Sequence, residues 1–386
     1  MPVHKQSSQR LQQQGLALDT DRQFFRCLRE NGPMSRAAIS QLTGISRPTI
    51  SEAAGRLQGQ SLVNETKKKT QNKQGRAGIL YEINANRGVT LSVALDSQHI
   101  QMRLTDLAEN IVAEEQFKLA ALNGHAIPDY DVEAAHVPST RIDSSEAFFQ
   151  KLTTMAEDMV ARTKSAVLAI GISIADPVNS ETGQVLPLHG APFPLAHDIN
   201  FPSLFASMFH CPITIDNDVN WATMAERSQG NAIGEKNFMF FYFGRGIGAG
   251  IYINGHLIRG SSGIAGEVGY FKVDGSKNLQ DYVVENQLGK ALLENRSLYD
   301  HPAMDKIIHV ISNAGILVNP DLIVIGGPLS RHDAFMKTLK DTIPQRTLMP
   351  TRVIASAMPD TAPLCGASAG AHELALASLG LIQHPE

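Results

Sequence analysis

Cysteine is scarce in this chain, with three residues of this type among 386. Cys27, Cys211 and Cys365 lie far apart, form no CxxC pair and have no histidine at ligand spacing. Disulfide frameworks and cysteine-rich zinc sites both need closely spaced thiols. The sequence therefore argues against both and predicts three separate buried thiols.

Long apolar runs are also missing. No segment reaches the ~20 apolar residues that a bilayer-spanning helix needs, and the first ten residues, MPVHKQSSQR, contain no signal-peptide core. We therefore expect no membrane segment and a cytoplasmic protein. A hydrophobic fraction of 43% with 31 Gly and 19 Pro is typical of a globular α/β protein, and the length favours two or three domains.

Charge is divided unevenly along the chain. Residues 1–87 carry 14 Lys and Arg against 6 Asp and Glu, a net charge of +8, whereas the whole chain has −4. The remainder is therefore acidic, with a net charge of −12. A basic head on an acidic body indicates that the head binds a polyanion such as nucleic acid, although a solvated basic face has the same composition.

The basic part begins with a Gln-rich stretch, residues 1–18, which we interpret as a flexible arm. A helix capped at Asp19 or Thr20 is predicted to run to about Glu30, where Asn-Gly-Pro stops it. These features place the start of a folded domain at residue 19.

A helix-turn-helix is predicted next. Ser35 opens a short helix, Gly44 supplies a tight turn, and Ser46 caps a second helix that tolerates Pro48 in its first turn. Such a unit can present its second helix to the DNA major groove. The residues expected to point inward are Ala38, Ile39, Leu42, Ile45, Ile50, Ala53 and Leu57.

Two strands around a basic loop follow and predict a wing that completes a winged helix-turn-helix over residues 19–84. Lysines in such a loop suit phosphates, and an arginine beside glycine suits a narrow minor groove. The loop alone is also compatible with a solvated turn, and the whole unit with a protein-binding module. The residues expected to contact double-stranded DNA are Ser46, Arg47, Thr49, Ser51 and Arg56 of the second helix and Lys67, Lys68, Lys69 and Arg76 of the wing.

Residues 88–386 show two β-rich starts, each followed by helices, which predicts two α/β lobes with a cleft between them. A surface loop is expected over 123–145, and Phe148, Phe149, Leu152, Met155, Met159 and Val160 are expected to form the inner stripe of a helix near 145–164. Strands are predicted over 88–96, 101–106, 111–117, 167–173, 238–243, 251–253 and 322–327.

Several glycine-rich motifs resemble the ROK family (repressors, open reading frames and kinases), on its repressor branch. The longest match closes with Gly266-Glu267-Val268-Gly269, and the resemblance covers about residues 20–380, including the head. It implies an actin-like, sugar-kinase-like (ribonuclease H-like) body with two lobes over 88–386, which binds a ligand and oligomerises. The matching stretches are GISIADPVNSETG (171–183), IDNDVNWA (215–222), GRGIGAGIYINGHLIRGSSGIAGEVG (244–269) and VNPDLIVIGG (318–327).

The phosphate loops of the kinases in this family are changed here. The first loop, normally Asp-x-Gly-Gly-Thr, is Asp96-Ser97-Gln98-His99-Ile100, and Arg245 replaces the usual Thr of the second. Glycines let backbone amides approach phosphate oxygens, and we expect Gln98 and His99 to bring side chains into that space. The comparison therefore predicts no ATP cofactor and no phosphoryl transfer.

Sugar-contacting positions of the family are partly retained. Asp218 matches the kinase general base and is interpreted here as a ligand hydrogen-bonder. Asn217 and Asp218 are also compatible with simple capping of a helix near Val219, and Glu267 with an ordinary turn acid. The expected ligand-binding residues are Asn217, Asp218, Glu267, Tyr270 and Gln280.

Other departures concern the metal and the pocket. The family histidine that normally binds zinc is Tyr270, and the segment after Val273 has no cysteine, so we predict no metal site. Gln280 replaces a sugar-contacting Glu, and Asp176 replaces a glycine. The pocket has therefore changed, and its ligand need not be a common hexose.

Three functions remain open at this point. The leading hypothesis is a regulator, a repressor of sugar-utilisation genes, that acts as a homodimer or homotetramer and is controlled by a sugar or sugar derivative. The alternatives are an active sugar kinase with a fused DNA-binding head and a scaffold that has lost ligand binding.

Overall fold

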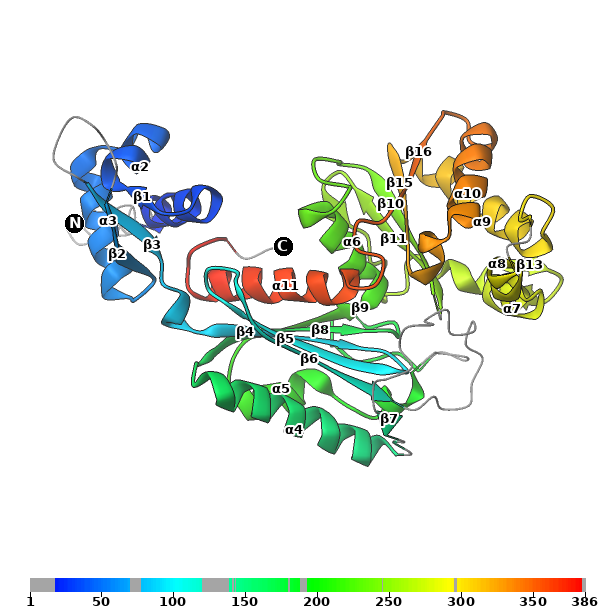
Figure 1. The fold of residues 1–386 in the computed structure, drawn as a ribbon, viewed down its shortest axis with the longest axis horizontal. Coiled ribbons are helices and arrows are strands. Elements are labelled where there is room, and N and C mark those ends of the chain that lie inside the picture. The colour runs from blue at the N-terminus through cyan, green and yellow to red at the C-terminus, as the bar shows by residue number, and fades with distance from the viewer. Residues whose placement is uncertain are drawn as a thin grey trace, which may run out of the picture.

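The computed structural model describes residues 18–69, 78–119, 139–140, 142, 144–179, 181–187, 193–244, 246–294 and 297–383. These residues form a small N-terminal head and two α/β lobes, arranged in a row (Figure 1). Among them, no helix is both long enough and apolar enough to cross a membrane.

The head is a helix-turn-helix packed beside a three-stranded sheet of order β1-β3-β2. Ser35 and Ser46 cap its second and third helices, accepting hydrogen bonds from the backbone amides of Ala38 and Thr49. Gly44 ends the first of these two helices at φ 72°, a left-handed conformation that suits glycine. The elements are a helix over 18–31, β1 (Met34–Ser35), α2 (Arg36–Thr43), α3 (Arg47–Gly59), β2 (Val63–Lys69) and β3 (Ile79–Ile83).

The predicted helix-turn-helix is confirmed in outline, with one difference in its packing. Leu42 was expected on the inner face of α2, but its side chain is 59% exposed, whereas Ile39 is fully buried. A two-turn helix such as α2 has room for few core residues, because its apolar stripe covers only about 100°.

The first lobe is a six-stranded sheet of order β7-β6-β5-β4-β8-β9. Helices α4 and α5 cover one face and α11 covers the other (Figure 1). The bounds are β4 (Val89–Leu95), β5 (His99–Asp106), β6 (Ile111–Leu119), β7 (Ser139–Thr140), α4 (Ser145–Thr163), β8 (Val167–Ile174), α5 (Phe201–Phe209), β9 (Ile213–Asn217) and α11 (Ala362–Ser378), with short helices at Ala85–Arg87 and Pro194–Ala196.

The second lobe repeats this pattern in a five-stranded sheet of order β12-β11-β10-β15-β16. In each lobe an antiparallel meander of three strands is followed by two parallel strands. The prediction of a second β-rich segment that opens a second lobe is therefore confirmed. The bounds are α6 (Asp218–Gln229), β10 (Phe238–Phe243), β11 (Ile247–Ile253), β12 (His256–Leu257), β13 (Lys272–Asp274), β14 (Lys277–Asn278), α7 (Leu279–Glu285), α8 (Leu288–Leu293), α9 (Pro302–Val318), β15 (Leu322–Gly326), α10 (Asp333–Arg346) and β16 (Arg352–Ala355), with short helices at Val268–Tyr270 and Pro328–Arg331.

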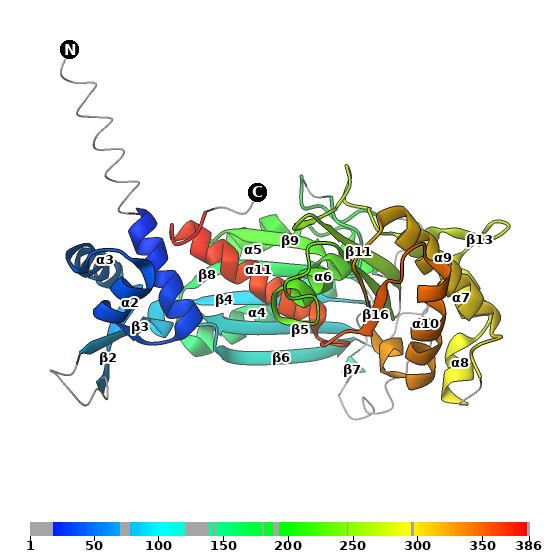
Figure 2. The same cartoon turned by 90° about the horizontal axis from the view of Figure 1, so that it is seen from above.

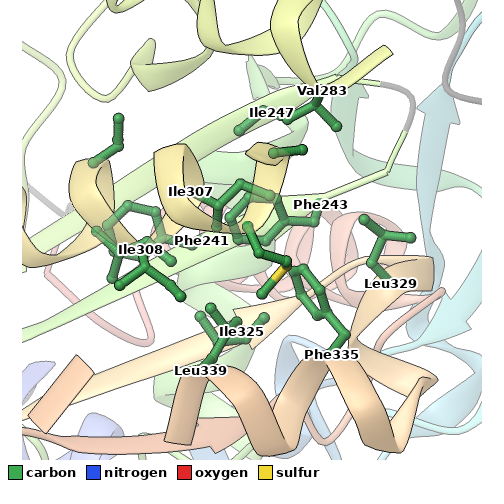
Figure 3. Close-up of a cluster of buried hydrophobic side chains, with 14 of the residues drawn as sticks. Phe241, Phe243, Ile247, Val283, Ile307, Ile308, Ile325, Leu329, Phe335 and Leu339 are labelled. Atoms are coloured by element: carbon green, nitrogen blue, oxygen red, sulfur yellow. The ribbon is translucent and has the colours of Figure 1, made fainter. Parts of the chain in front are cut away.

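Each lobe has its own hydrophobic core. Figure 3 shows part of the core of the second lobe, where Phe241 and Phe243 of β10 pack under α9 and α10. The rings of Phe243 and Phe335 meet edge to face with centroids 5.4 Å apart. In the first lobe, Phe148 is buried under α4 as predicted, but Phe149 is 41% exposed.

The head shares its core with the first lobe. Phe24 and Leu28 of the first helix lie in one buried cluster with Leu107 from the turn between β5 and β6, with Leu376 near the end of α11, and with Leu381 just after that helix. The interior of the head is therefore completed by residues of the body.

Helices α6 and α11 cross between the two lobes in contact so close that no side chain fits between them at Gly366 and Gly370. A Cβ at Gly366 of α11 would lie 2.0 Å from the backbone oxygen of Trp221, and one at Gly370 would lie 2.2 Å from the indole ring. The indole Nε1 donates a hydrogen bond to Ile172 O at 2.7 Å, which fixes the ring in place. The two lobes therefore meet at a helix contact that only glycine permits.

Gly366→Ala is expected to lower the free energy of unfolding by about 1–3 kcal/mol, because the added methyl group overlaps a backbone atom that cannot turn away. Urea denaturation measures this loss. Gly55→Ala is the control, since no atom lies within 4 Å of the added Cβ there, and it is expected to be neutral or stabilising. Equal stabilities of the two variants would contradict this account of the crossing.

Candidate functional site

A cavity lies where the ends of strands from both lobes meet. Asp96 follows β4, Ala175 follows β8, and Asn217 ends β9, while the second lobe contributes the start of β11 and residues 263–270. Ligand sites of α/β proteins lie at the carboxyl ends of parallel strands, and β4, β8 and β9 run parallel. All five predicted ligand-binding residues line this cavity: Asn217, Asp218, Glu267, Tyr270 and Gln280.

The start of α6 carries two of these residues. The side-chain oxygen of Asn217 accepts a hydrogen bond from the amide of Val219 at 2.9 Å, and Asp218 Oδ1 accepts from the same amide at 2.7 Å. The capping interpretation is therefore correct, and it does not compete with the ligand interpretation, because both side chains also line the cavity. Capping fixes the position at which they face it.

Two cavity carboxyls hold protons near neutral pH. Burial, with smaller contributions from the charges of Glu267, Asp96 and Asp176, raises the pKa of Asp218 to about 8. Burial and the charge of Asp176 raise the pKa of Glu267 to about 7. A protonated carboxyl can donate a hydrogen bond as well as accept one, which suits the hydroxyl groups of a ligand.

Glu267, Tyr270 and Gln280 come from the segments that follow β11. Glu267 stands next to Gly266, which has a φ of 91° and packs so closely that a Cβ would lie 1.8 Å from Ala249 O. Gln280 of α7 accepts a hydrogen bond from the amide of Ile247 at 3.3 Å. These contacts join the glycine-rich segment to the strand that forms the cavity wall.

Asp96 folds back on its own turn. Its Oδ1 accepts hydrogen bonds from the amides of Gln98 at 2.6 Å and of His99 at 2.8 Å. Burial favours a higher pKa for Asp96, but the His99 ring and these amides together lower it. Asp96 and Ser97 line the cavity, whereas Gln98 is buried and neither Gln98 nor His99 is among its lining residues. The expectation that Gln98 and His99 occupy the phosphate space stays a prediction.

A buried Asp–His pair beside the cavity was not predicted from the sequence. Asp176 is fully buried, and its Oδ1 accepts a hydrogen bond from the amide of Phe193, while the His197 Nε2 lies 2.8 Å from its other oxygen. Burial raises the pKa of Asp176 despite the opposing effect of His197. The substitution of glycine by Asp176 was visible in the sequence, but nothing there indicated His197 as its partner.

Ser173 is a second residue that the sequence did not single out. It lines the cavity, is 1% exposed, and its hydroxyl has no hydrogen-bond partner among the described residues. A buried hydroxyl without a partner costs free energy, and a ligand hydroxyl would satisfy it. Only the fold brings this strand residue to the cavity.

The start of α3 is the candidate DNA surface. Ser46 and Arg47 are exposed and Thr49 and Ser51 are partly exposed. The hydroxyls of Ser46 and Thr49 lie 2.7 Å apart, and Ser51 donates a hydrogen bond to Arg47 O. Arg47 is thus the first residue of a capped, hydrogen-bonded helix start.

Arg56 was expected to point away from the head, but its side chain pairs with the first helix. Its Nη2 lies 2.6 Å from Asp21 Oδ1, and its Nε donates to both oxygens of that carboxylate. Asp21 belongs to the first helix, so this ion pair ties α3 to its neighbour. Because its guanidinium already has a partner, the proposed contact of Arg56 with DNA would require breaking or sharing this pair.

The predicted wing lies only partly within the described residues. Lys67, Lys68 and Lys69 belong to strand β2, but their side chains lie outside the described residues. Arg76 lies outside them altogether, as does Arg245 of the second glycine loop. The wing contacts stay predictions.

Within the described ranges, no group of three or more His, Cys, Asp or Glu residues is arranged to hold a metal ion.

The fold and the cavity together define a sugar-kinase-like protein with an N-terminal helix-turn-helix. The profile of the ROK family matches residues 90–287, just over half of the chain. The protein belongs to the ROK family, as its motifs predicted.

Two relatives are named as repressors. The chain is 26% identical to the xylose repressor of Bacillus spizizenii over 245 residues, which covers 64% of this chain and 58% of the relative. The chain thus matches less than two thirds of that relative's length. It is 25% identical over 393 residues to a putative xylose repressor of Caldicellulosiruptor sp., covering 89% of this chain and 92% of the relative.

Solved structures of both regulators and kinases share the fold. A ROK family transcriptional regulator described as a homolog of the E. coli MLC protein superimposes with a TM-score of 0.67 at 17% identity, covering 95% of this chain and 99% of that one. A ROK glucokinase from Streptomyces griseus, in complex with glucose and AMPPNP, gives 0.54 at 18% identity, covering 74% and 100%. The fold alone therefore does not separate the two activities.

The raised pKa of Asp218 predicts a pH dependence of stability. Between its ordinary value of 3.8 and the folded value of about 8, the native state binds more protons than the unfolded state, so stability falls as pH rises through this window. Asp218→Asn should therefore raise the melting temperature more at about pH 8 than at about pH 5. Asp158 is an exposed acid on α4, so Asp158→Asn serves as the control. If both substitutions changed the melting temperature equally at both pH values, the raised pKa of Asp218 would be refuted.

Proposed function

We propose that the protein is a sequence-specific DNA-binding transcription regulator, a repressor of sugar-utilisation genes controlled by a sugar or sugar derivative. Residues 19–84 form the DNA-binding domain, and residues 88–386 bind the ligand in the cavity and form a homodimer or homotetramer. The observation that carries this proposal is the capped start of α3, which presents Arg47 outward from a helix-turn-helix.

The chemistry of the cavity supports an unphosphorylated, hydroxylated ligand. Asp96, Asp218 and Glu267 line it, and none of its described lining residues is Lys, Arg or His. Among these described lining residues a phosphate dianion would meet carboxyls and no opposing charge. Hydroxyl groups fit better, because Asn217, Ser173 and the protonated carboxyls can pair with them. The repressor relatives carry xylose in their names, which makes D-xylose the first sugar to test.

We further propose that the protein is not an enzyme. The support is the sequence of its two phosphate loops and the repressor names of its relatives. The alternative, a sugar kinase with a DNA-binding head, is favoured by the position of Asp218 in the cavity, where its raised pKa suits a base. Sugar-dependent ATP turnover that is lost in Asp218→Asn would establish this alternative.

Arg47→Ala is expected to weaken binding to a duplex selected from random DNA by about 1–3 kcal/mol, a roughly 5- to 150-fold rise in Kd, because a base contact is lost. Fluorescence anisotropy of the labelled duplex measures this change. Arg346→Ala, on α10 of the second lobe, is the control and should bind as the unchanged protein does. If Arg47→Ala bound equally well, Arg47 would not read a base.

Sugar binding should stabilise the fold. At a concentration about 100 times its Kd, a bound sugar adds about 2.7 kcal/mol to the free energy of unfolding. Melting curves with D-xylose, other pentoses and hexoses, and their phosphates are expected to show stabilisation by an unphosphorylated sugar that Glu267→Gln weakens. If no sugar or sugar phosphate stabilised the protein, a scaffold without ligand would be the better description.

A further inference from the structure

Helix α11 reaches from the cavity to the head. Pro363 in its first turn lines the cavity, and Leu376 near its end lies in the core shared with Phe24 and Leu28 of the head. Figure 2 shows this helix crossing the first lobe, with α6 beside one end and the head beside the other. One rigid element therefore touches both candidate sites.

At the cavity end, α11 is fixed to the helix that carries Asp218. Trp221 lies one turn after Asp218 on α6, and its backbone and ring pack directly on Gly366 and Gly370. Because these contacts leave no room for a methyl group, α6 cannot slide or tilt without moving α11. A change at the start of α6 can thus reach α11 through this packed helix crossing.

At the head end, one arginine bridges three elements. Arg29 of the first helix donates a hydrogen bond from Nε to Glu109 Oε1 at 2.6 Å, and its Nη2 lies 2.8 Å from Glu373 Oε1 on α11. The backbone just after the end of α11 is also held, because Arg22 Nε donates to Gly380 O at 3.0 Å. Side chains of the head thus grip both the helix and the sheet of the first lobe.

The turn that presents Glu109 is itself held in shape. Asp106 Oδ1 accepts hydrogen bonds from the amides of Ala108 and Asn110 at 2.8 and 3.0 Å. Glu109 between them has a φ of 66°, a left-handed conformation that these bonds maintain. The carboxylate that receives Arg29 therefore has a fixed position on the first lobe.

A neutral histidine fills the interior of this junction. His372 of α11 is 2% exposed, and neither of its ring nitrogens has a hydrogen bond among the described residues. Its Nε2 lies 3.5 Å from Glu109 Oε1. Burial is the main cause of its lowered pKa and outweighs the opposing charge of Glu109, and the charge of Arg29 lowers this pKa further. Arg29 is consequently the cation that the carboxylates of Glu109 and Glu373 share.

We propose that α11 couples the cavity to the head, and that Arg29 is the positioning residue that holds the recognition helix in the orientation set by α11. This inference depends on the proposed DNA-binding function. Coupling between two sites is reciprocal, so DNA bound at the head must also alter the crossing of α11 and α6. The sole tryptophan of the chain, Trp221, lies at that crossing and reports on it.

The experiment titrates the full-length protein with the labelled duplex selected from random DNA. Anisotropy of the label measures binding, and emission of Trp221, excited where DNA does not absorb, measures the state of the crossing. We expect the emission to change and saturate together with the anisotropy. In Arg29→Ala the duplex should still bind, with the emission change lost, because the grip of the head on α11 is broken.

Arg26→Ala is the matched control, since Arg26 lies on the same helix and its ion pair within the described residues is an exposed one with Glu30 at 4.0 Å. It should keep the emission change. Glu373→Gln, which preserves the size of the side chain, should reproduce the loss and serves if Arg29→Ala fails to fold. Binding without an emission change in the unchanged protein, or an undiminished change in Glu373→Gln, would overturn the proposal, whereas absence of any anisotropy change would overturn the DNA-binding function itself.

Discussion

The close packing of α11 on α6 is the constraint on which the arrangement of the whole molecule depends. Each lobe buries its own sheet, but the lobes are joined where Gly366 meets the backbone of Trp221. Asn217, which caps α6, and Asp218, its first residue, face the cavity, and the same α11 ends in the core of the head. One helix crossing therefore relates three parts that the chain builds separately.

The electrostatics of the cavity follow from its position between the lobes. Segments of both lobes bring Asp96, Asp218 and Glu267 to one cavity, where burial and the charges of the other two carboxyls make ionisation of Asp218 harder. Asp96 escapes this effect because its own turn supplies amides and His99. Asp218 has a single amide, so it keeps its proton to about pH 8. Differences in local hydrogen bonding thus give similar carboxyls different roles.

Much of the fold could be predicted from the sequence, because it depends on local signals. Ser35, Gly44 and Ser46 mark the helix-turn-helix through capping and turn chemistry, and the five cavity residues were found through motif resemblance. Contacts between distant segments could not be predicted in this way. The Arg56–Asp21 pair, the partner of Asp176 and the buried Ser173 hydroxyl arise only when helices and strands far apart in the chain are packed together.

The core shared by the head and α11 has a consequence for the order of folding during synthesis. The ribosome makes Phe24 and Leu28 early, whereas Leu376 and Leu381, which complete the cluster around them, are made last. The hydrogen-bond acceptor of Arg22, Gly380 O, is likewise 358 residues further along the chain. Domains generally fold as they emerge, the N-terminal one first. Here the nascent head remains incompletely packed until the body has been translated, so a ribosome that stalls before α11 leaves a head unable to finish its interior.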